Sequence, residues 1–311
     1  MLDISHFHDA IKRHYTTDEN SINFYSEIFN ETKNENLLDS NFITQMSSLD
    51  KTLQRLSELL ILKYCKDSLS SIGVKINSKD EGPDISFNFS EKKINIEIIT
   101  PIQVDQKKSS LALFSNESPS NPVAERRGSV EQYIPEMESL HARITGSLKE
   151  KSEKYEKYLS KETINPDDFN IVCINLGFIK NNEFIDYNYL KNLFKKQEVI
   201  MINIDENKNI THSIEDRDFH VHKKNLTNFR SSYFDNKEYL HIDGVWIISC
   251  NEKNFKFIKN IYFDKFEKCK NILYANGNEI IHKDLTSILS INEPEKDYFT
   301  NYIRKNGKLP D

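Results

Sequence analysis

Two acidic residues between positions 81 and 101 have the type and spacing of a metal site. Asp84 and Glu97 belong to two short runs of alternating apolar and polar residues, which predict half-buried strands joined by a polar turn. With Phe89 opposite Ile94, the apolar residues of both runs share one face, and the two acids become diagonal neighbours on the other. Carboxylates so placed can hold one Mg²⁺, while water and a substrate phosphate complete its shell.

Short motifs in and beyond this segment point to a family. The run GPD at 82–84 precedes the predicted hairpin, and IEIITP at 96–101 ends it. RIT follows at 143–145 and FNIVCIN at 169–175. Together they resemble the PD-(D/E)XK phosphodiesterase superfamily, which has the restriction-endonuclease-like fold, and in particular an uncharacterised bacterial branch of it. The chain departs from the superfamily pattern at Ile99, where that pattern has a lysine two residues after the acid.

The resemblance implies a metal-dependent nuclease in which Asp84 and Glu97 ligate Mg²⁺ or Mn²⁺. It also implies a replacement for the missing lysine, because the superfamily tolerates its migration onto a neighbouring element. The helix predicted at 138–161 carries Lys151 and Tyr155 at the spacing of a Gln-x-x-x-Tyr motif in the RecB-like exonuclease branch. Lys151 is therefore the first candidate for the catalytic ammonium, which would orient the attacking water or offset charge developing at phosphorus.

The same predicted helix offers supporting residues. Arg143, Lys151 and Tyr155 fall at multiples of four, so they line one face, and Arg143 is a candidate partner for a phosphate or an acid. Lys149 is the second candidate for the catalytic lysine. The alternative for all these basic residues is a solvated, lysine-rich helix face.

Glu58 is a candidate third acid. It lies within a strongly apolar helix predicted at 49–68, where a buried carboxylate is costly unless it is paired or binds a metal. Members of the resembled superfamily often supply an acid from the helix before the hairpin. The alternative is an ion pair with a neighbouring lysine or arginine at the edge of the helix.

The segment 102–138 is predicted to be a flexible, loop-like insert, since serine, asparagine, proline and charged residues dominate it. An insert of this length within a domain is usually functional or mobile. Its basic residues are candidates for binding nucleic-acid phosphates: Lys107, Lys108, Arg126 and Arg127. The alternative is a solvated insert without a ligand.

The composition limits the kinds of partner that the protein can bind. The chain has 311 residues, of which 37% are hydrophobic and 29% charged, with a net charge of −6. This acidic balance argues against a protein that coats nucleic acid electrostatically, although one local basic surface is compatible with it. Four dispersed cysteines predict buried thiols in a reducing compartment, and the absence of a signal peptide or an apolar span favours a cytoplasmic protein without a membrane.

These observations predict a mixed α/β protein that forms one domain over 1–311. We expect a helical N-terminal cover at 1–48 and an αβββαβ core with a mixed central sheet at 49–178. Extra strands and a terminal helix are expected at 179–311. The leading function is a metal-dependent phosphodiesterase acting on DNA, with a homodimer as a further candidate assembly. The alternative is an inactive module of the same fold that binds nucleic acid or a protein partner, and Ile99 and the acidic net charge support it.

Overall fold

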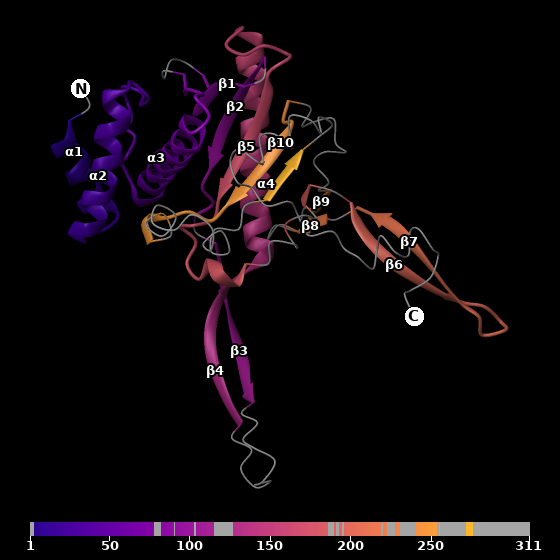
Figure 1. Cartoon of the computed structure of the whole chain (residues 1–311). Coiled ribbons are helices and arrows are strands. Elements are labelled where there is room, and N and C mark those ends of the chain that lie inside the picture. The colour runs from indigo at the N-terminus through magenta and orange to yellow at the C-terminus, as the bar shows by residue number, and fades with distance from the viewer. Residues whose placement is uncertain are drawn as a thin grey trace.

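The protein is a mixed α/β structure in which helices flank a central five-stranded sheet, as Figure 1 shows for the computed structural model. The structure describes residues 3–77, 82–89, 91–102, 104–114, 127–185, 190, 193–194, 196–218, 220–222, 228–230, 241–253, 255 and 272–275.

Four α-helices are present in these ranges: α1 (Ile4–His14), α2 (Glu19–Asn34), α3 (Leu49–Ser70) and α4 (Met137–Ser160). The first three begin at side chains that accept a hydrogen bond from a backbone N–H of the first turn, namely Asp3, Asp18 and Ser48. A short 3₁₀ helix, η1, spans Asn182–Phe184. None of the described helices combines the length and apolar character needed to cross a bilayer.

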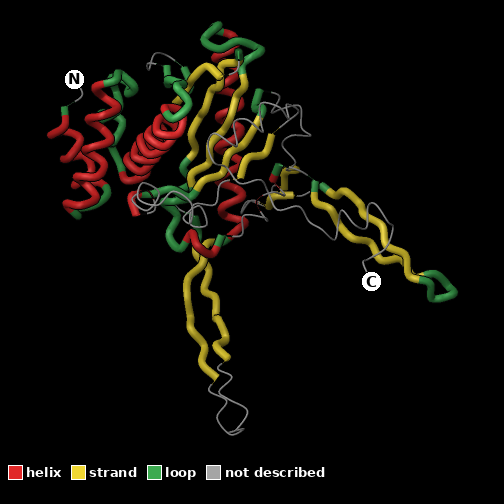
Figure 2. The backbone as a smooth tube through the Cα atoms, in the orientation of Figure 1, coloured by secondary structure: helices red, strands yellow, loops and turns green. Residues whose placement is uncertain are grey.

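The sheet has the strand order β1-β2-β5-β10-β11 and is mixed in direction. Figure 2 shows its strands side by side, with helices on both sides of them. Its strands are β1 (Ile85–Phe89), β2 (Lys92–Ile99), β5 (Phe169–Asn175), β10 (Gly244–Ile248) and β11 (Ile272–Ala275). The three inner strands β2, β5 and β10 run parallel, and the two edge strands are antiparallel to their neighbours. The chain reaches β5 from β2 through α4, as a parallel pair requires a crossover.

Burial divides the sheet into two packed faces. One face contributes alternate residues such as Ile96 and Ile98 to a core shared with α1, α2 and α3. The opposite face contributes Ile99, Val172 and Ile174 to a second core with α4. Each face of the sheet therefore packs against its own set of helices, and Glu97, one position after Ile96, points to the α4 side.

The hairpin forms with the expected faces but in a different register. The expected pairing placed Phe89 opposite Ile94, whereas Phe87 pairs with Ile94 and Phe89 with Lys92. A shift of two residues keeps every side chain on its face, which is why alternation alone could not exclude it. The shift brings Asp84, immediately before β1, directly beside Glu97 rather than diagonal to it.

The expected third strand of the core is reduced to one bridge. The αβββαβ core requires a strand between α3 and β1, but α3 continues to Ser70, and among the described residues before β1 only Ile76 forms a bridge, with Phe87. The three inner strands of the observed sheet are β2, β5 and β10, and β10 lies beyond the predicted core at 49–178. The terminal helix expected near the end of the chain lies outside the described residues.

Three two-stranded ribbons lie outside the central sheet: β3 (Gln106–Phe114) with β4 (Arg127–Pro135), β6 (Gln197–Ile204) with β7 (Ile210–Arg217), and β8 (His220–His222) with β9 (Asn228–Arg230). The first corrects the prediction of a loop-like insert at 102–138. Its strands pair over nine residues, so the backbone groups that face the partner strand are satisfied without joining the sheet. Figure 1 shows the β3–β4 and β6–β7 ribbons projecting away from the sheet.

Side-chain contacts tie the N-terminal helices to the end of β10. The phenol of Tyr15 donates to Oε1 of Glu252 and that of Tyr25 to Oε2, each at 2.9 Å. The adjacent chain is tightly packed, because a Cβ at Gly177 would lie 2.2 Å from the carbonyl oxygen of Cys250. Three buried cysteines, Cys65, Cys173 and Cys250, are free thiols, in agreement with the prediction.

Candidate functional site

Glu97 lies at the centre of a buried cluster of charged side chains. It belongs to β2, faces α4 and has an exposed fraction of 0%. Its Oε2 atom accepts hydrogen bonds from Nζ of Lys151 at 2.6 Å and from Nζ of Lys154 at 2.7 Å. Its Oε1 atom lies 2.9 Å from the hydroxyl of Tyr158, so both carboxylate oxygens have partners on α4.

Asp84 is the second acid of the cluster. Its Oδ2 atom accepts a hydrogen bond of 2.8 Å from the backbone N–H of Ile98, which fixes the carboxylate against β2. The same oxygen lies 3.5 Å from Nζ of Lys151, and Oδ1 lies 3.9 Å from Nζ of Lys154. Both ammonium groups therefore form ion pairs with both acids, and that of Lys151 lies closer to Asp84.

The geometry of α4 explains how three of its side chains reach one point. Lys151, Lys154 and Tyr158 are separated by three and then four residues, so they follow one stripe of the helix surface. Between them Tyr155 turns into the core, where its hydroxyl lies 2.7 Å from the carbonyl oxygen of Ile171. Tyr155 therefore anchors the helix to the sheet, and the polar stripe beside it faces the acids.

Electrostatics keeps both ammonium groups charged. Burial by itself lowers the pKa of Lys151, but the nearby carboxylates of Asp84 and Glu97 outweigh it, and the pKa is raised above its ordinary value. The same balance raises the pKa of Lys154. Burial and the adjacent Glu97 raise the pKa of Tyr158, so its phenol remains a proton donor. Two carboxylates thus face two ammonium groups, with no net formal charge.

Sequence reasoning named three residues of this cluster and missed two. Asp84, Glu97 and Lys151 come together as expected, whereas Lys154 and Tyr158 were not singled out. A signal for them was present, because Lys-x-x-x-Tyr occurs at 151–155 and again at 154–158. In the second copy both residues contact Glu97, whereas in the first the tyrosine is buried elsewhere.

Two other predicted supporting residues are not part of the cluster. Arg143 and Lys149 are exposed on α4, and neither has an ion pair or hydrogen bond to the two acids in the described part of the chain. Neither residue therefore contacts the two acids, and the contact of Arg143 with a phosphate stays a prediction. Lys149 precedes Lys151 by two residues, so at about 100° per residue it points to nearly the opposite side of the helix. Arg143 precedes Lys151 by eight residues, which places it about 12 Å farther along the helix axis.

The predicted phosphate-binding residues lie on or beyond the β3–β4 ribbon. Lys107 and Lys108 are exposed on β3. Arg127 begins β4, although its side chain lies outside the described part, and Arg126 lies outside the described residues altogether. Lys108 pairs in register with Tyr133, whose exposed fraction is 57%. A cation and an aromatic ring thus occupy facing positions on the ribbon.

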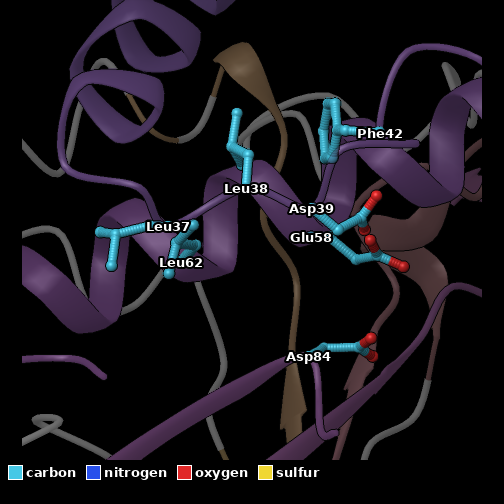
Figure 3. Close-up of a pocket in the computed structure, with 7 residues that line it drawn as sticks. All are labelled: Leu37, Leu38, Asp39, Phe42, Glu58, Leu62 and Asp84. Atoms are coloured by element: carbon cyan, nitrogen blue, oxygen red, sulfur yellow. The ribbon is translucent and has the colours of Figure 1, made fainter. Parts of the chain in front are cut away.

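Glu58 lies beside the cluster and has an arginine partner. Its carboxylate is paired with Arg55, which is also 3.6 Å from Asp39. Glu58, Asp39 and Asp84 line one small cleft, with an empty volume of about 250 Å³ including its open mouth. In Figure 3 the three carboxylates point to the same side. The predicted alternative, an ion pair on α3, is therefore present, and Glu58 nevertheless borders the same opening as Asp84.

The two acids fit a magnesium or manganese ion in donor chemistry. Such ions are typically held by one or two carboxylates, and waters and substrate phosphates fill the remaining positions. Asp84 and Glu97 would supply these carboxylates. Within the described ranges there is no cluster of three or more histidine, cysteine, aspartate or glutamate side chains suited to a metal. A metal here would thus depend on two protein ligands, and an ammonium group would have to leave Oε2 of Glu97.

Comparison of the chain with protein-family models, with curated proteins and with solved structures gives no match.

Proposed function

We propose that the protein is a metal-dependent phosphodiesterase that hydrolyses nucleic acid, with DNA as its substrate. The observation that carries the proposal is the convergence of Asp84, Glu97 and Lys151, in which one ammonium group contacts both carboxylates. These residues come from a hairpin and from the helix after it, as the resemblance to the PD-(D/E)XK superfamily implies. Lys151 would fill the role that Ile99 leaves empty on the strand.

Each side chain has a separate task in this proposal. A divalent ion held by Asp84 and Glu97 would activate water and neutralise charge on the phosphate. The N–H of Ile98 holds Asp84 in place, and the hydroxyl of Tyr158 holds Glu97. Lys151 keeps its positive charge and would donate to a phosphate oxygen as charge develops there. Hydrolysis forms a bond between the water oxygen and phosphorus, breaks the P–O bond to the leaving oxygen and transfers a proton from water to that oxygen.

Two supports favour nucleic acid as the substrate, and the first of them favours DNA over RNA. Most of the superfamily that the chain resembles acts on DNA, which is an argument by analogy. In addition, the β3–β4 ribbon presents Lys107 and Lys108 to solvent on a chain of net charge −6, so it supplies a local basic surface. Along the chain this ribbon connects β2 to α4, the two elements that carry the cluster, and Figure 1 shows it projecting from the end of the body at which α4 begins.

The test is cleavage of DNA and RNA with Mg²⁺ or Mn²⁺ by the full chain and three variants. We expect Asp84→Asn and Lys151→Met to lower the rate about 100-fold or more, because each removes a group that acts on the reacting phosphate. Lys149→Met is the matched control, since it removes the same charge from an exposed position of α4. Cleavage that survives Asp84→Asn unchanged would overturn the assignment of the site.

A second function is favoured by the charge balance of the cluster. Two buried acids that are already neutralised by two lysines can serve as a structural ion-pair network in an inactive module. Such a module would bind nucleic acid through the ribbon without metal. Binding without cleavage, lost in a Lys107→Ala/Lys108→Ala variant but retained in Asp84→Asn, would support this second function.

A further inference from the structure

The two lysines of the cluster differ in how firmly they are held. The side chain of Lys151 has an exposed fraction of 13%, and that of Lys154 has 39%. Lys151 is also nearer to Asp84, at 3.5 Å, than Lys154 is, at 3.9 Å. Lys154 is therefore the ammonium group that can leave with less loss of contacts and with more of its hydration already in place.

The charge balance requires one lysine ammonium group to leave Glu97 when a divalent ion binds. Asp84 and Glu97 carry two negative charges, which the two lysines already balance. A divalent ion would leave an excess of two positive charges beside a fully buried carboxylate. Like charges within a few ångströms repel strongly in such a site. Oε2 of Glu97 cannot keep two ammonium hydrogen bonds and also ligate a metal.

Lys154 also lies over an aromatic ring while it binds Oε2 of Glu97. Its Nζ atom lies 5.6 Å from the centre of the Tyr158 ring, which favours a cation over its face. The same tyrosine holds Oε1 of Glu97. A side chain that releases Oε2 can therefore stay near the site, over the ring or in solvent, while Glu97 keeps its orientation.

We propose that Lys154 is a displaceable counter-cation, which binds Oε2 of Glu97 in the metal-free protein and competes directly with the incoming divalent ion. The inference rests on the proposed function, because it assumes that Asp84 and Glu97 bind a metal. Lys154 thus sets the threshold of metal concentration at which the site fills, whereas Lys151 remains in place.

The test is Mn²⁺ binding to the full chain, measured by calorimetry without substrate. We expect Lys154→Met to bind Mn²⁺ about three- to tenfold more tightly than the wild type, because it removes a partly exposed competing ion pair. Lys157→Met is the matched control: Lys157 is exposed on the same helix, so its loss changes the net charge equally and should leave the affinity unchanged. Lys154→Gln provides a second neutral variant if the methionine variant does not fold.

A thermal-shift series gives an independent readout. Without metal, Lys154→Met should melt at a lower temperature than the wild type, because Glu97 has lost one of its two cations. Mn²⁺ should then raise its melting temperature by more than it raises that of the wild type. Equal or weaker Mn²⁺ affinity in Lys154→Met and Lys154→Gln, with binding still abolished by Asp84→Asn, would overturn the inference alone. Absence of saturable Mn²⁺ binding, or binding that Asp84→Asn does not affect, would overturn the proposed function as well.

Discussion

Tyr155 and Tyr158 lie one turn apart on α4, yet their hydroxyl groups have different partners. The hydroxyl of Tyr155 contacts the carbonyl oxygens of Asn95 and Ile171 between two strands. That of Tyr158 contacts Glu97 and the carbonyl oxygen of Gly82. The first is an anchor for the helix, and the second orients a carboxylate of the site.

Replacing each tyrosine by phenylalanine should separate these roles. Tyr155→Phe should lower the free energy of unfolding by about 1–2 kcal/mol, because it leaves buried carbonyl groups without their donor, and should not change Mn²⁺ affinity. Tyr158→Phe should lower Mn²⁺ affinity by about tenfold, the usual effect of losing a partner of a metal ligand. Urea denaturation and calorimetry measure the two quantities. Similar effects of both variants on Mn²⁺ binding would contradict the distinction.

The burial of Asp243, just before β10, leads us to expect that the stability of the folded state depends on pH. Burial raises the pKa of this carboxyl to about 6, against the opposing effects of the Asn170 N–H, Lys92 and His241. The folded state therefore binds this proton more tightly than the unfolded chain, and stability falls as pH rises from about 4 to about 6.

Asp243→Asn should remove this loss of stability. At about pH 7.5 we expect the variant to be more stable than the wild type by roughly 1–3 kcal/mol, and near pH 4 the difference should largely vanish. The asparagine oxygen can still accept the hydrogen bond from Asn170. Urea denaturation at several pH values measures the difference. A variant that is less stable at pH 7.5 would show that the ionised carboxylate is stabilised rather than strained by its site.

At the scale of elements, the β3–β4 ribbon is connected to the body through a closed base. The N–H of Glu136 donates to the carbonyl oxygen of Asp105 at 2.7 Å, and the hydroxyl of Ser139 lies 3.1 Å from the N–H of Asp105. The two ends of the ribbon are therefore adjacent, and a short linker between Asp105 and Glu136 can replace it.

Excision of residues 106–135 should leave the sheet and the acid–lysine cluster folded. We expect Mn²⁺ affinity to stay within about twofold of the wild type, because every contact of the cluster lies outside the ribbon. DNA affinity should fall strongly, because Lys107 and Lys108 are removed. Fluorescence anisotropy with labelled DNA measures the second quantity. Unchanged DNA affinity would place the binding surface elsewhere.

Some elements could be predicted from the sequence, whereas others could not, and each case has a physical reason. Alternation in the hairpin identifies which residues share a face, but it is unchanged by a two-residue shift, so the pairing of Phe89 was wrong. The long apolar run of α3 and the helical stripe of α4 are strong local signals. The β3–β4 ribbon was missed because its strands pair only with each other, and its polar composition matches that of a loop. Lys154 was missed because helix spacing alone cannot rank neighbouring lysines.

At the scale of the whole molecule, Glu252 joins the beginning of the chain to the end of β10. Its carboxylate accepts hydrogen bonds from Tyr15 and Tyr25, on either side of the turn between α1 and α2. Both tyrosines are over 200 residues away in sequence, at separations of 237 and 227. The N-terminal helices are thus coupled to the sheet through a buried polar contact as well as through the shared apolar core.

Glu252→Gln should weaken this coupling. A glutamine has one acceptor oxygen for two phenols, so we expect the free energy of unfolding to fall by about 1–3 kcal/mol. Tyr15→Phe should partly restore stability in the Glu252→Gln background, because it removes the phenol left without an acceptor. Denaturation followed by far-ultraviolet circular dichroism measures both effects. A Glu252→Gln variant as stable as the wild type would show that the apolar core alone holds the helices.

The construction of the cluster limits how the protein can respond to a ligand. Both acids are fixed to the sheet, one on an inner strand and the other by a backbone hydrogen bond to it, whereas both cations end flexible side chains of a single anchored helix. Filling the site would therefore change the side-chain rotamers of Lys154 and its neighbours and leave the path of the backbone almost unchanged. Measurements of the backbone conformation would therefore give the same result with and without the ligand. Signals from lysine Nζ or tyrosine ring nuclei would differ between these two states.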